Sequence, residues 1–429
     1  MILGSSCSQT KRLTEGEVLY TGVKKMNIET AKGVKLEGPK SSAISGPLGF
    51  PPNNPLYAPY IRSPFPVGLW VYNWNVKKEK GLKHWLYKKL AKKPVLISDV
   101  QPELRLKVVE NAASEYGYFG VNQLRDLRTN GIPKKISYNV YVPEATCWER
   151  LNFGLTGRMD SLIQRTQRGC LLKSGAEYNL YTMEDERTRI TKMFRNSGYY
   201  YFQSDYIEFL VDTTRERRVA DVRIALKHGV PAVALQPYKV GNVELVLENS
   251  DQSETQDTLS YKGIEVKYTK PLDVKPKVLA RSMHLLPGDT YSFWRQNRTQ
   301  TSLARLGIFK YTNLNVTRAD SVKKSGFGSL DFSINAVYDL PIETEIEVDV
   351  SSKSNNLLGP GLSLGITNKN LFRGGENLTF KLNGAYEWEV GDKKTNSNSG
   401  LINSYELGVN VGLSLPRLLV PNFLKSSKE

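Results

Sequence analysis

Apolar and polar side chains alternate along four segments near the end of the sequence. The segments are Ile342–Val350, Pro360–Asn368, Glu376–Val390 and Leu401–Leu415. Successive side chains on a strand point to opposite faces, so the alternation predicts four strands, each with one apolar and one polar face. In the first segment the polar positions form an acidic row, which consists of Glu343, Glu345, Glu347 and Asp349.

Two kinds of sheet fit this alternation. An antiparallel sheet packed on a soluble core alternates in the same way as the strands of a membrane barrel. However, the polar positions are rich in glycine, serine and asparagine, which suit a water-filled lumen, and no long helical segment follows that could cover the apolar face. The segments also reach about the 9–11 residues that a tilted strand needs to cross a bilayer. The pattern therefore favours the first antiparallel strands of a transmembrane β-barrel over residues 342–429.

Four strands do not close a barrel, because small barrels need about eight. An open edge in hydrocarbon would leave backbone groups unpaired at several kcal/mol each. We therefore expect the 429 residues to be the front part of a longer protein that carries an incomplete barrel. Tyr386, Trp388 and Tyr405 point to the apolar side and suit an interfacial aromatic girdle, although strand propensity alone also accounts for them.

The chain before residue 340 repeats one unit three times, each with an opening strand, helices and closing strands. The opening strands are predicted at Val18–Ile28, Cys147–Phe153 and Val240–Leu247. The last helices are predicted at Pro102–Glu115, Met183–Ser197 and Arg295–Arg305. The closing strands are predicted at Lys135–Val142, Tyr206–Val211, Val219–Leu226, Tyr311–Val316 and Leu330–Leu340. The units span residues 18–145, 146–235 and 236–341, after an N-terminal segment at 1–17.

The clearest shared feature of the units is a helix that ends at a glycine followed by aromatic or apolar residues. Glycine is favoured just past a helix end because it adopts the left-handed conformation without a Cβ clash. A Gly-Asp turn before the third helix supplies an acid to its N-terminus. These motif residues are Gly198, Tyr199, Tyr200, Gly288, Asp289, Leu306, Gly307 and Phe309. The first unit also carries a long insertion, residues 30–76, whose many prolines and aromatics predict an ordered irregular loop.

The formal net charge is +16, and Lys77–Lys93 holds eight of the lysines and one glutamate. Leu82, Trp85, Leu86 and Leu90 recur there at helical spacing, which predicts a basic amphipathic helix able to lie on a lipid surface. Alternatively, Trp85 and Leu86 dock the helix on its own domain. No nucleic-acid-binding motif accompanies the lysines, so we expect no nucleic-acid partner.

Cysteine placement raises two questions. Cys7 follows small residues near the N-terminus, as in a bacterial lipobox, although only six residues precede it and a signal peptide needs more. We expect lipidation at Cys7, with chance similarity as the alternative. Cys147 and Cys170 are equally compatible with a disulfide and with two free thiols.

Nothing in the sequence predicts an enzyme. His84, His228 and His284 stand alone in their segments, and no metal-binding or phosphate-binding motif is present. We therefore expect no catalytic residue, no metal and no cofactor.

Several strings resemble a known family. The Gly198-Tyr199-Tyr200 string and the strand-helix-helix-strand-strand order resemble POTRA domains. The string Asn370-Leu371-Phe372-Arg373-Gly374-Gly375-Glu376 resembles the first hairpin of the BamA/TamA-like outer-membrane assembly factors. The strings that begin at Cys7, Arg62 and His84 are similar to the lipidated branch of that family, TamL. Asn370, Leu371, Phe372, Gly374 and Gly375 are the hairpin motif residues.

The resemblance implies a bacterial outer-membrane location, with the POTRA domains in the periplasm. It implies that the arm recruits unfolded outer-membrane proteins or a periplasmic or inner-membrane partner, and that the first barrel strand pairs with client strands. That strand's apolar positions are Ile342, Thr344, Ile346, Val348 and Val350. In the third unit, Tyr311–Val316 and Val240–Leu247 are candidate edge strands for partners. Three alternatives remain: a two-partner-secretion translocator, a soluble nucleic-acid-binding protein that uses the lysine helix, and an outer-membrane surface antigen without insertase activity.

Overall fold

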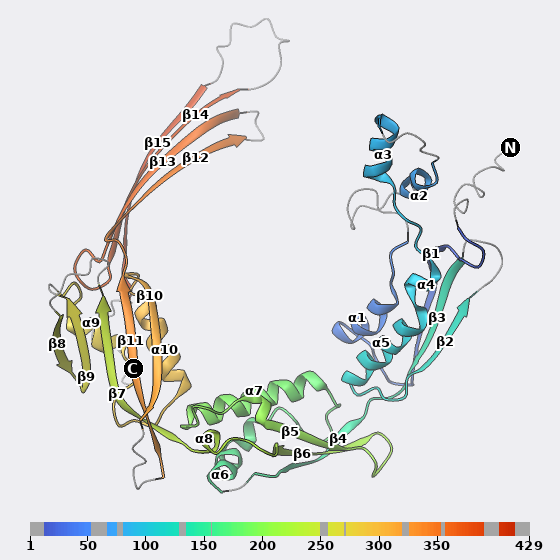
Figure 1. Cartoon of the computed structure of the whole chain (residues 1–429), viewed down its shortest axis with the longest axis horizontal. Helices are drawn as coiled ribbons and strands as arrows, with labels where there is room; N and C mark the ends of the chain where they lie inside the picture. The colour runs from blue at the N-terminus through green and yellow to red at the C-terminus, as the bar shows by residue number, and fades with distance from the viewer. Residues whose placement is uncertain are drawn as a thin grey trace, which may run out of the picture. The chain divides into compact units, whose positions relative to one another are not determined.

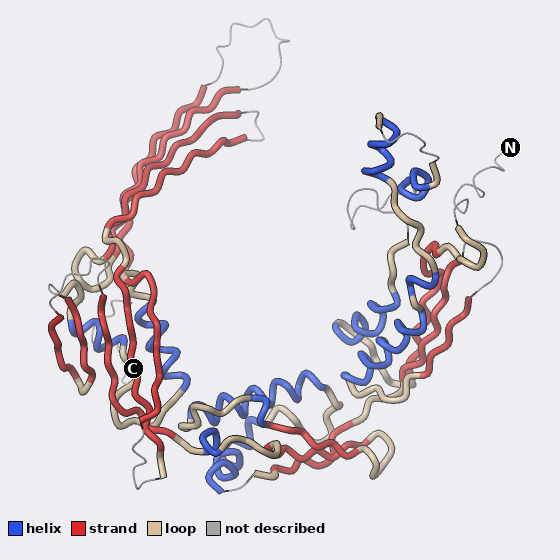
Figure 2. Tube along the Cα trace, viewed as in Figure 1, coloured by secondary structure: helices blue, strands red, loops and turns tan. Residues whose placement is uncertain are grey.

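The computed structural model describes ten stretches of the chain. They are residues 13–52, 67–74, 80–127, 134–155, 157–248, 256–269, 272–319, 326–352, 357–389 and 403–416. The chain divides into two compact units, one of residues 1–189 and 207–227 and the other of residues 190–206 and 228–429. The predicted fold class is confirmed, because mixed α/β modules precede consecutive antiparallel strands (Figures 1 and 2).

The first unit contains two three-stranded sheets. One joins β1 (Tyr20–Thr30), β3 (Lys134–Val142) and β2 (Asn122–Leu127), and the other joins β4 (Cys147–Phe153), β6 (Val219–Leu226) and β5 (Ile207–Asp212). The helices of the first module are α1 (Pro39–Ser45), α2 (Val67–Tyr72), α3 (Leu82–Leu90), α4 (Ile97–Val100) and α5 (Pro102–Glu115). Between β4 and β5 come α6 (Gly157–Thr166) and α7 (Leu180–Asn196).

The second unit contains a five-stranded and a four-stranded sheet. The first has the order β10-β11-β7-β9-β8, with strands Phe309–Ala319, Gly328–Tyr338, Tyr238–Glu248, Ile264–Thr269 and Gln256–Tyr261. The helices of this module are α8 (Ala232–Leu235), α9 (Pro276–Ser282) and α10 (Phe293–Ala304). The second sheet has the order β12-β13-β14-β15, with strands Ile342–Ser352, Leu357–Lys369, Asn377–Glu389 and Asn403–Ser414.

The three α/β sheets share one topology. In each, the module's first strand pairs parallel with its last strand, and the last strand pairs antiparallel with the strand before it. Parallel neighbours need a crossover connection, which the helices between them provide. The apolar residues of these helices complete the core, as Leu279 of α9 and Leu303 of α10 do beside Leu245 of β7 and Ile334 of β11.

The same β-bulge also recurs in the three opening strands. The register shifts lie between Tyr20 and Val23 in β1, between Trp148 and Leu151 in β4, and between Val240 and Val243 in β7. Each of these shifts inserts one extra residue into the opening strand, and β1 has a second shift between Val23 and Lys25. A bulge kept at one place in three sheets is a structural feature of the repeat.

An aspartate caps the bulge in the last two modules. The Asp221 carboxylate accepts a 3.2 Å hydrogen bond from the Arg150 N–H. The Asp331 carboxylate accepts one of 2.7 Å from the Asn242 N–H. Since a bulge leaves its extra residue outside the ladder, the aspartate satisfies a backbone donor that the opposite strand does not.

The structure corrects two expectations. Residues 30–76 are not an irregular loop throughout, since α1 and α2 lie within this insertion. In addition, Val240–Leu247 is not an edge strand, because β7 pairs with β11 on one side and with β9 on the other. The reason is the β8–β9 hairpin, which the sequence reading missed.

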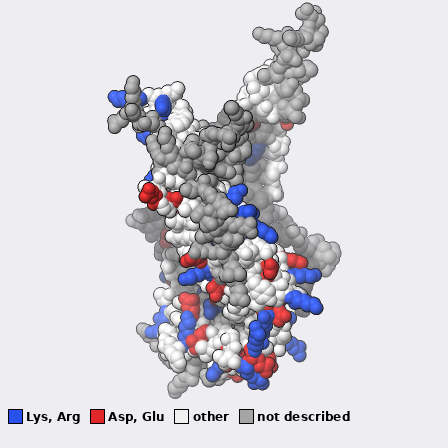
Figure 3. Space-filling view, turned by 90° about the vertical axis from the view of Figure 1, so that its right-hand side faces the viewer, with Lys and Arg blue, Asp and Glu red and all other residues white. Residues whose placement is uncertain are grey.

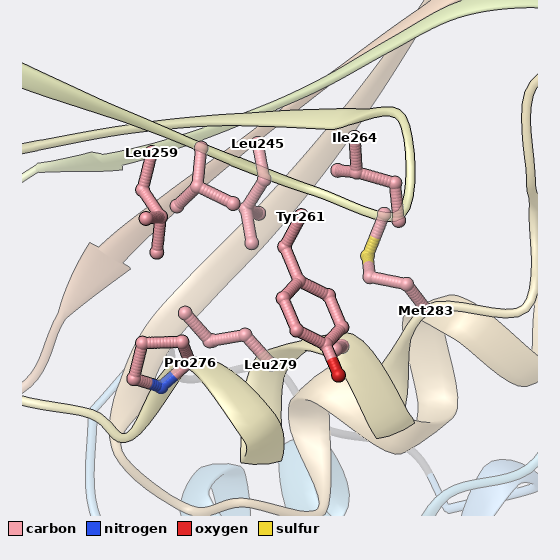
Figure 4. A pocket seen from close by; sticks show the side chains of 9 residues that line it. Leu245, Leu259, Tyr261, Ile264, Pro276, Leu279 and Met283 are labelled. Atoms are coloured by element: carbon pink, nitrogen blue, oxygen red, sulfur yellow. The ribbon is translucent and has the colours of Figure 1, made fainter.

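The β8–β9 hairpin is held by apolar contacts with α9. Leu259 and Ile264 of the hairpin line a small apolar pocket with Pro276, Leu279 and Met283 (Figure 4). The pocket is part of the module's core. These apolar contacts explain how the two short strands remain attached beside β7.

Candidate functional site

The register of β12–β15 aligns the predicted apolar positions within the described strands on one face; Val390 and Leu401 lie outside the described residues. One row across the sheet contains Ile346, Leu364, Leu382 and Val409, and the next contains Thr344, Ile366, Phe380 and Val411. Because the side-chain period of a strand is two, a slip of one residue would have moved an entire strand's set to the other face. The alternation predicted from the sequence is therefore realised in three dimensions.

Side chains on this apolar face are strongly exposed. Ile346 and Val348 of β12 are 74% and 73% exposed, and Tyr405 and Leu407 of β15 are each 80% exposed. Soluble proteins rarely expose such a contiguous apolar surface, and a large one marks a membrane or protein contact. The exposure of this face is thus of the kind found at membrane or protein contacts.

The polar face carries hydrogen bonds between neighbouring strands. The Lys381 ammonium pairs with Glu345 at 2.6 Å, and the Ser363 hydroxyl donates to Asn383 at 2.6 Å. The buried Glu387 carboxylate accepts from the Ser351 hydroxyl at 2.8 Å. The acidic row is thus partly neutralised by lysines, and this face presents a connected polar surface.

β15 forms one edge of the sheet, and β12 forms the other. Among the described residues its partner is β13 alone. The predicted client-pairing residues all lie on this strand and share its apolar face; they are Ile342, Thr344, Ile346, Val348 and Val350. In the third module β10, which contains Tyr311–Val316, is also at a sheet edge. An unpaired strand side presents N–H and C=O groups to another chain.

The aromatic residues at one end of the apolar face lie near one another. The ring centroids of Tyr386 and Trp388 are 6.1 Å apart, and Tyr386 is opposite Tyr405 in the register. This grouping suits a position at a membrane interface, where amphipathic rings are enriched.

The hairpin motif forms the turn between β13 and β14, and this turn is attached to the third module. The Asn370 amide donates to the Asp273 carbonyl at 2.7 Å and accepts from the Gly375 N–H at 2.9 Å. The Lys275 N–H donates to the Arg373 carbonyl at 2.9 Å, and the Arg373 guanidinium donates to the Leu272 carbonyl. Three hydrogen bonds therefore join the turn to the segment that precedes α9.

Close packing also constrains Gly375 in this turn. Its φ is +84°, and a Cβ there would lie 2.9 Å from the Leu306 carbonyl oxygen and 3.2 Å from Pro416. Glycine is needed both for the conformation and for the close approach. Phe372 and Leu371 in the same turn remain 55% and 38% exposed, so they do not anchor it.

A salt bridge connects the start of the strand sheet to the same turn. The Lys369 ammonium lies 2.7 Å from Asp339 and 2.9 Å from Glu343. The hydrogen bond from Lys369 lowers the pKa of the Asp339 carboxyl. The Asp339 N–H in turn donates to the Ile308 carbonyl at 2.9 Å, which extends the connection to the third module.

The Gly-aromatic motif joins α7 to the third module. The Gly198 carbonyl accepts from the Tyr238 N–H at 2.8 Å, and the Tyr200 and Tyr291 rings meet edge to face at 5.0 Å. Gly198 has φ +108°, and a Cβ would lie 3.2 Å from Pro237. Tyr199 is buried and packs edge to face on Phe194.

The first unit contains an equivalent junction. The Gly117 carbonyl accepts from the Thr146 N–H at 2.9 Å, and the Phe119 and Tyr178 rings meet at 5.3 Å. Gly117 also has positive φ, and a Cβ would lie 2.8 Å from the Tyr178 carbonyl. The glycine turn thus acts as a joint between one module's helix and the next module's first strand.

The remaining motif residues lie around the third module's helix and closing strands. Gly288 forms a turn at φ +87°, and Asp289 pairs with Arg295 of α10. Leu306 is buried, and Gly307 follows α10 with φ +67°. Phe309 begins β10 and packs on Tyr338 at 5.2 Å. These roles are structural.

The cysteine predictions have different outcomes. Cys7 lies outside the described residues. Cys147 and Cys170 are free thiols. Burial, followed by the nearby Glu186 carboxylate, raises the pKa of Cys170 to about 11. Glu186 itself is fully buried and makes two hydrogen bonds with Arg189, at 2.8 and 2.7 Å.

The described part of the chain contains no cluster of three or more His, Cys, Asp or Glu side chains suited to a metal ion. Nor does any of its helices have the length and apolar character of a membrane-spanning helix. The chemistry that the geometry supports is backbone pairing at the β12 edge together with apolar contact on the adjoining face.

Sequence reasoning missed the residues that receive the hairpin turn. Leu272, Asp273 and Lys275 contribute main-chain groups, and main-chain groups leave no signature in residue type. The capping aspartates Asp221 and Asp331 were also missed. The signal for them was an acid near the start of each closing strand.

No family model and no curated protein matches the chain. Solved structures give distant matches. BamA from Haemophilus ducreyi lacking POTRA domains 1–3 is 14% identical, with 62% of this chain and 47% of that chain covered and a TM-score of 0.34. POTRA3–5 of Haemophilus influenzae BamA is 11% identical, with 76% and 99% covered and a TM-score of 0.31. CdiB from Acinetobacter baumannii is 11% identical, with 57% and 40% covered and a TM-score of 0.26. The chain spans about half the length of the Haemophilus ducreyi chain it matches.

Proposed function

We propose that this chain carries the periplasmic arm and the first membrane strands of an outer-membrane protein assembly or translocation factor. Its three α/β modules, at residues 18–145, 146–235 and 236–341, act as POTRA domains that recruit clients or a partner protein. Residues 342–429 contribute barrel strands. Cys7 carries the lipid in the manner of the TamL branch.

The observation that carries the proposal is the combination of features on β12. One side of this strand is paired with β13, and its apolar residues, such as Ile346 and Val350, are exposed on the same face as those of β13–β15. A strand of this kind pairs an incoming strand through its backbone and places the apolar side chains of both in one layer. Its clients would be unfolded outer-membrane proteins.

In this proposal the third module of the arm positions the strand sheet through the attached hairpin turn. The turn that follows β13 is bonded to the segment before α9 through Asn370 and Arg373. Since β12 pairs with β13 along its length, this contact fixes the start of the strand sheet to the third module. A client received by the module would then be delivered beside the β12 edge.

Proline substitution in the intact protein tests the edge. Successive backbone N–H groups point to opposite sides of a strand, so of Ile346→Pro and Glu347→Pro one removes a donor from the open side and the other from the β13 side. We expect the open-side variant to block assembly of outer-membrane clients in cells while the three modules keep native amide-exchange protection.

Ile346→Ala is the matched control, because it keeps the backbone donor and removes only the apolar side chain. We expect it to assemble clients far better than the proline variant. Normal client assembly with both proline variants would overturn the edge-pairing mechanism. A defect limited to secretion of one partner protein would favour a two-partner-secretion translocator, and the absence of any depletion phenotype would favour a surface antigen.

A further inference from the structure

Helix α3 exposes a mixed apolar and basic face. Leu82 and Trp85 are 73% and 56% exposed, and Lys88 and Lys89 are exposed beside them. Residues three and four apart share a helix face, so Trp85 lies between Leu82 on one side and the two lysines on the other. More than half of the Trp85 surface is therefore exposed, whereas Leu86, the other residue of the docking alternative, is half-buried.

The side of α3 that adjoins this face lies next to the neighbouring helix α2. Leu86 and Leu90 are half-buried, and the Lys92 N–H just after the helix donates to the Gly68 carbonyl at 3.0 Å. Gly68 is buried, and a Cβ there would lie 2.8 Å from the Lys92 side chain. This close contact fixes α3 beside α2, and Leu82 and Trp85 remain exposed.

Charge along this segment has a single sign. Lysines recur through and beyond the helix, and no acidic residue occurs between Lys80 and Ser98. The lysines are Lys80, Lys83, Lys88, Lys89, Lys92 and Lys93. Figure 3 shows Lys and Arg in blue and Asp and Glu in red over one face of the molecule. The charge complements an anionic surface, and the exposed indole and leucine identify the kind of surface.

We propose that the α3 face, defined as Leu82, Trp85, Lys88 and Lys89, binds the surface of an anionic phospholipid bilayer. The indole and the leucine enter the headgroup region, where tryptophan is enriched, and the lysines pair with lipid phosphates. Nucleic acid would pair with the lysines and stack on the indole but would leave Leu82 exposed to water. The proposal does not depend on β12–β15, because α3 belongs to the other compact unit.

Amine footprinting of the full chain tests the proposal at residue resolution. The chain is mixed with vesicles of phosphatidylcholine, or of phosphatidylcholine with phosphatidylglycerol, and acylated lysines are identified by peptide mass spectrometry. We expect the anionic vesicles to protect Lys88 and Lys89 and high salt to abolish the protection. Lys24 and Lys25, an exposed pair on β1, report background. Because the readout is local, insertion of the strand sheet into the vesicles does not obscure it.

Two double variants and one double control variant separate the contribution of the lysines from that of the apolar side chains. Lys88→Gln/Lys89→Gln should weaken the phosphatidylglycerol-dependent part of vesicle binding by about 25-fold, from about fivefold per lysine, whereas Lys24→Gln/Lys25→Gln should leave it unchanged. Leu82→Ser/Trp85→Ser should lose vesicle protection of Lys88 and Lys89 while keeping native amide exchange in α2. Equal acylation with and without anionic vesicles, unchanged protection in the serine variant, or protection by duplex DNA but not by vesicles would each overturn the proposal.

Discussion

The Asn370 side-chain amide donates a 2.7 Å hydrogen bond to the main-chain carbonyl of Asp273, which lies 97 positions earlier in the sequence. The same side chain accepts from the Gly375 N–H at 2.9 Å. Asn370 therefore closes its own turn and holds that turn on the third module. Asn370 thus stabilises both the conformation of the β13–β14 turn and the position of that turn on the third module.

Removal of the Asn370 side chain should loosen the hairpin turn from the module. Asn370 has φ 66°, so Asn370→Gly keeps the backbone conformation and removes two hydrogen bonds, each of which contributes about 0.5–1.5 kcal/mol. We expect faster amide exchange at Gly375 and at Lys275, with β7 and β11 unchanged. Asn313→Gly on the exposed part of β10 is the control. If exchange at both amides stays at the wild-type rate, the contact does not hold the turn.

Loss of a capping aspartate should open the bulge of its own module. Asp331→Ala removes the 2.7 Å acceptor of the Asn242 N–H and should cost about 0.5–1.5 kcal/mol, since water can reach the exposed donor. Asp331→Asn retains the carbonyl oxygen and should behave nearly as wild type. Amide exchange at Asn242 measures the effect. Similar exchange in the alanine and asparagine variants would show that the carboxylate oxygen is not the cap.

Sequence reasoning succeeded where one physical rule acts on every residue of an element. The β12–β15 segments alternate because one face is apolar along its whole length, and the register of Leu364 with Leu382 follows from that. The helix at Pro102–Glu115 was predicted with its observed bounds. The domain boundaries and the lipidation of Cys7 remain predictions.

The features that the sequence did not predict depend on contacts between distant segments. The β8–β9 hairpin is short, and Leu259 and Ile264 become core residues only when α9 packs against them. Its presence beside β7 made Val240–Leu247 an interior strand. Likewise, the carbonyl of Asp273 became a binding group for the hairpin turn only through the fold.

The junction glycine should resist substitution more than a glycine in open space. Gly198 and Gly229 both have positive φ, at +108° and +81°, but a Cβ at Gly198 would lie 3.2 Å from Pro237 and Thr290, while nothing lies within 4 Å of one at Gly229. An L-residue in the left-handed region costs about 1–2 kcal/mol, so both alanine variants carry strain. Only Gly198→Ala should also expose the Tyr238 amide to exchange. Equal protection of that amide in both variants would mean that the neighbours accommodate the methyl group.

Cys170 should be a poor nucleophile in the folded chain. Burial and the Glu186 carboxylate raise the pKa of its thiol from 9.0 to about 11, so at pH 8 the folded chain should be alkylated at Cys170 about a hundredfold more slowly than the denatured chain. The alkylation rate followed against pH by mass spectrometry should rise towards pH 11. Glu186→Gln removes the neighbouring negative charge and should increase the rate, although Arg189 then loses its charged partner.

The raised pKa of Cys170 also makes the stability of the first unit depend on alkaline pH. Between pH 9 and pH 11 the unfolded chain releases the thiol proton while the folded chain keeps it. The stabilisation is therefore complete below pH 9 and is lost as the pH rises through 11. Cys170→Ser, whose hydroxyl does not titrate in this range, should flatten that part of the profile, measured by amide exchange in α7 across pH after correction for the intrinsic exchange rate. An identical alkaline loss in the serine variant would assign the effect to other groups.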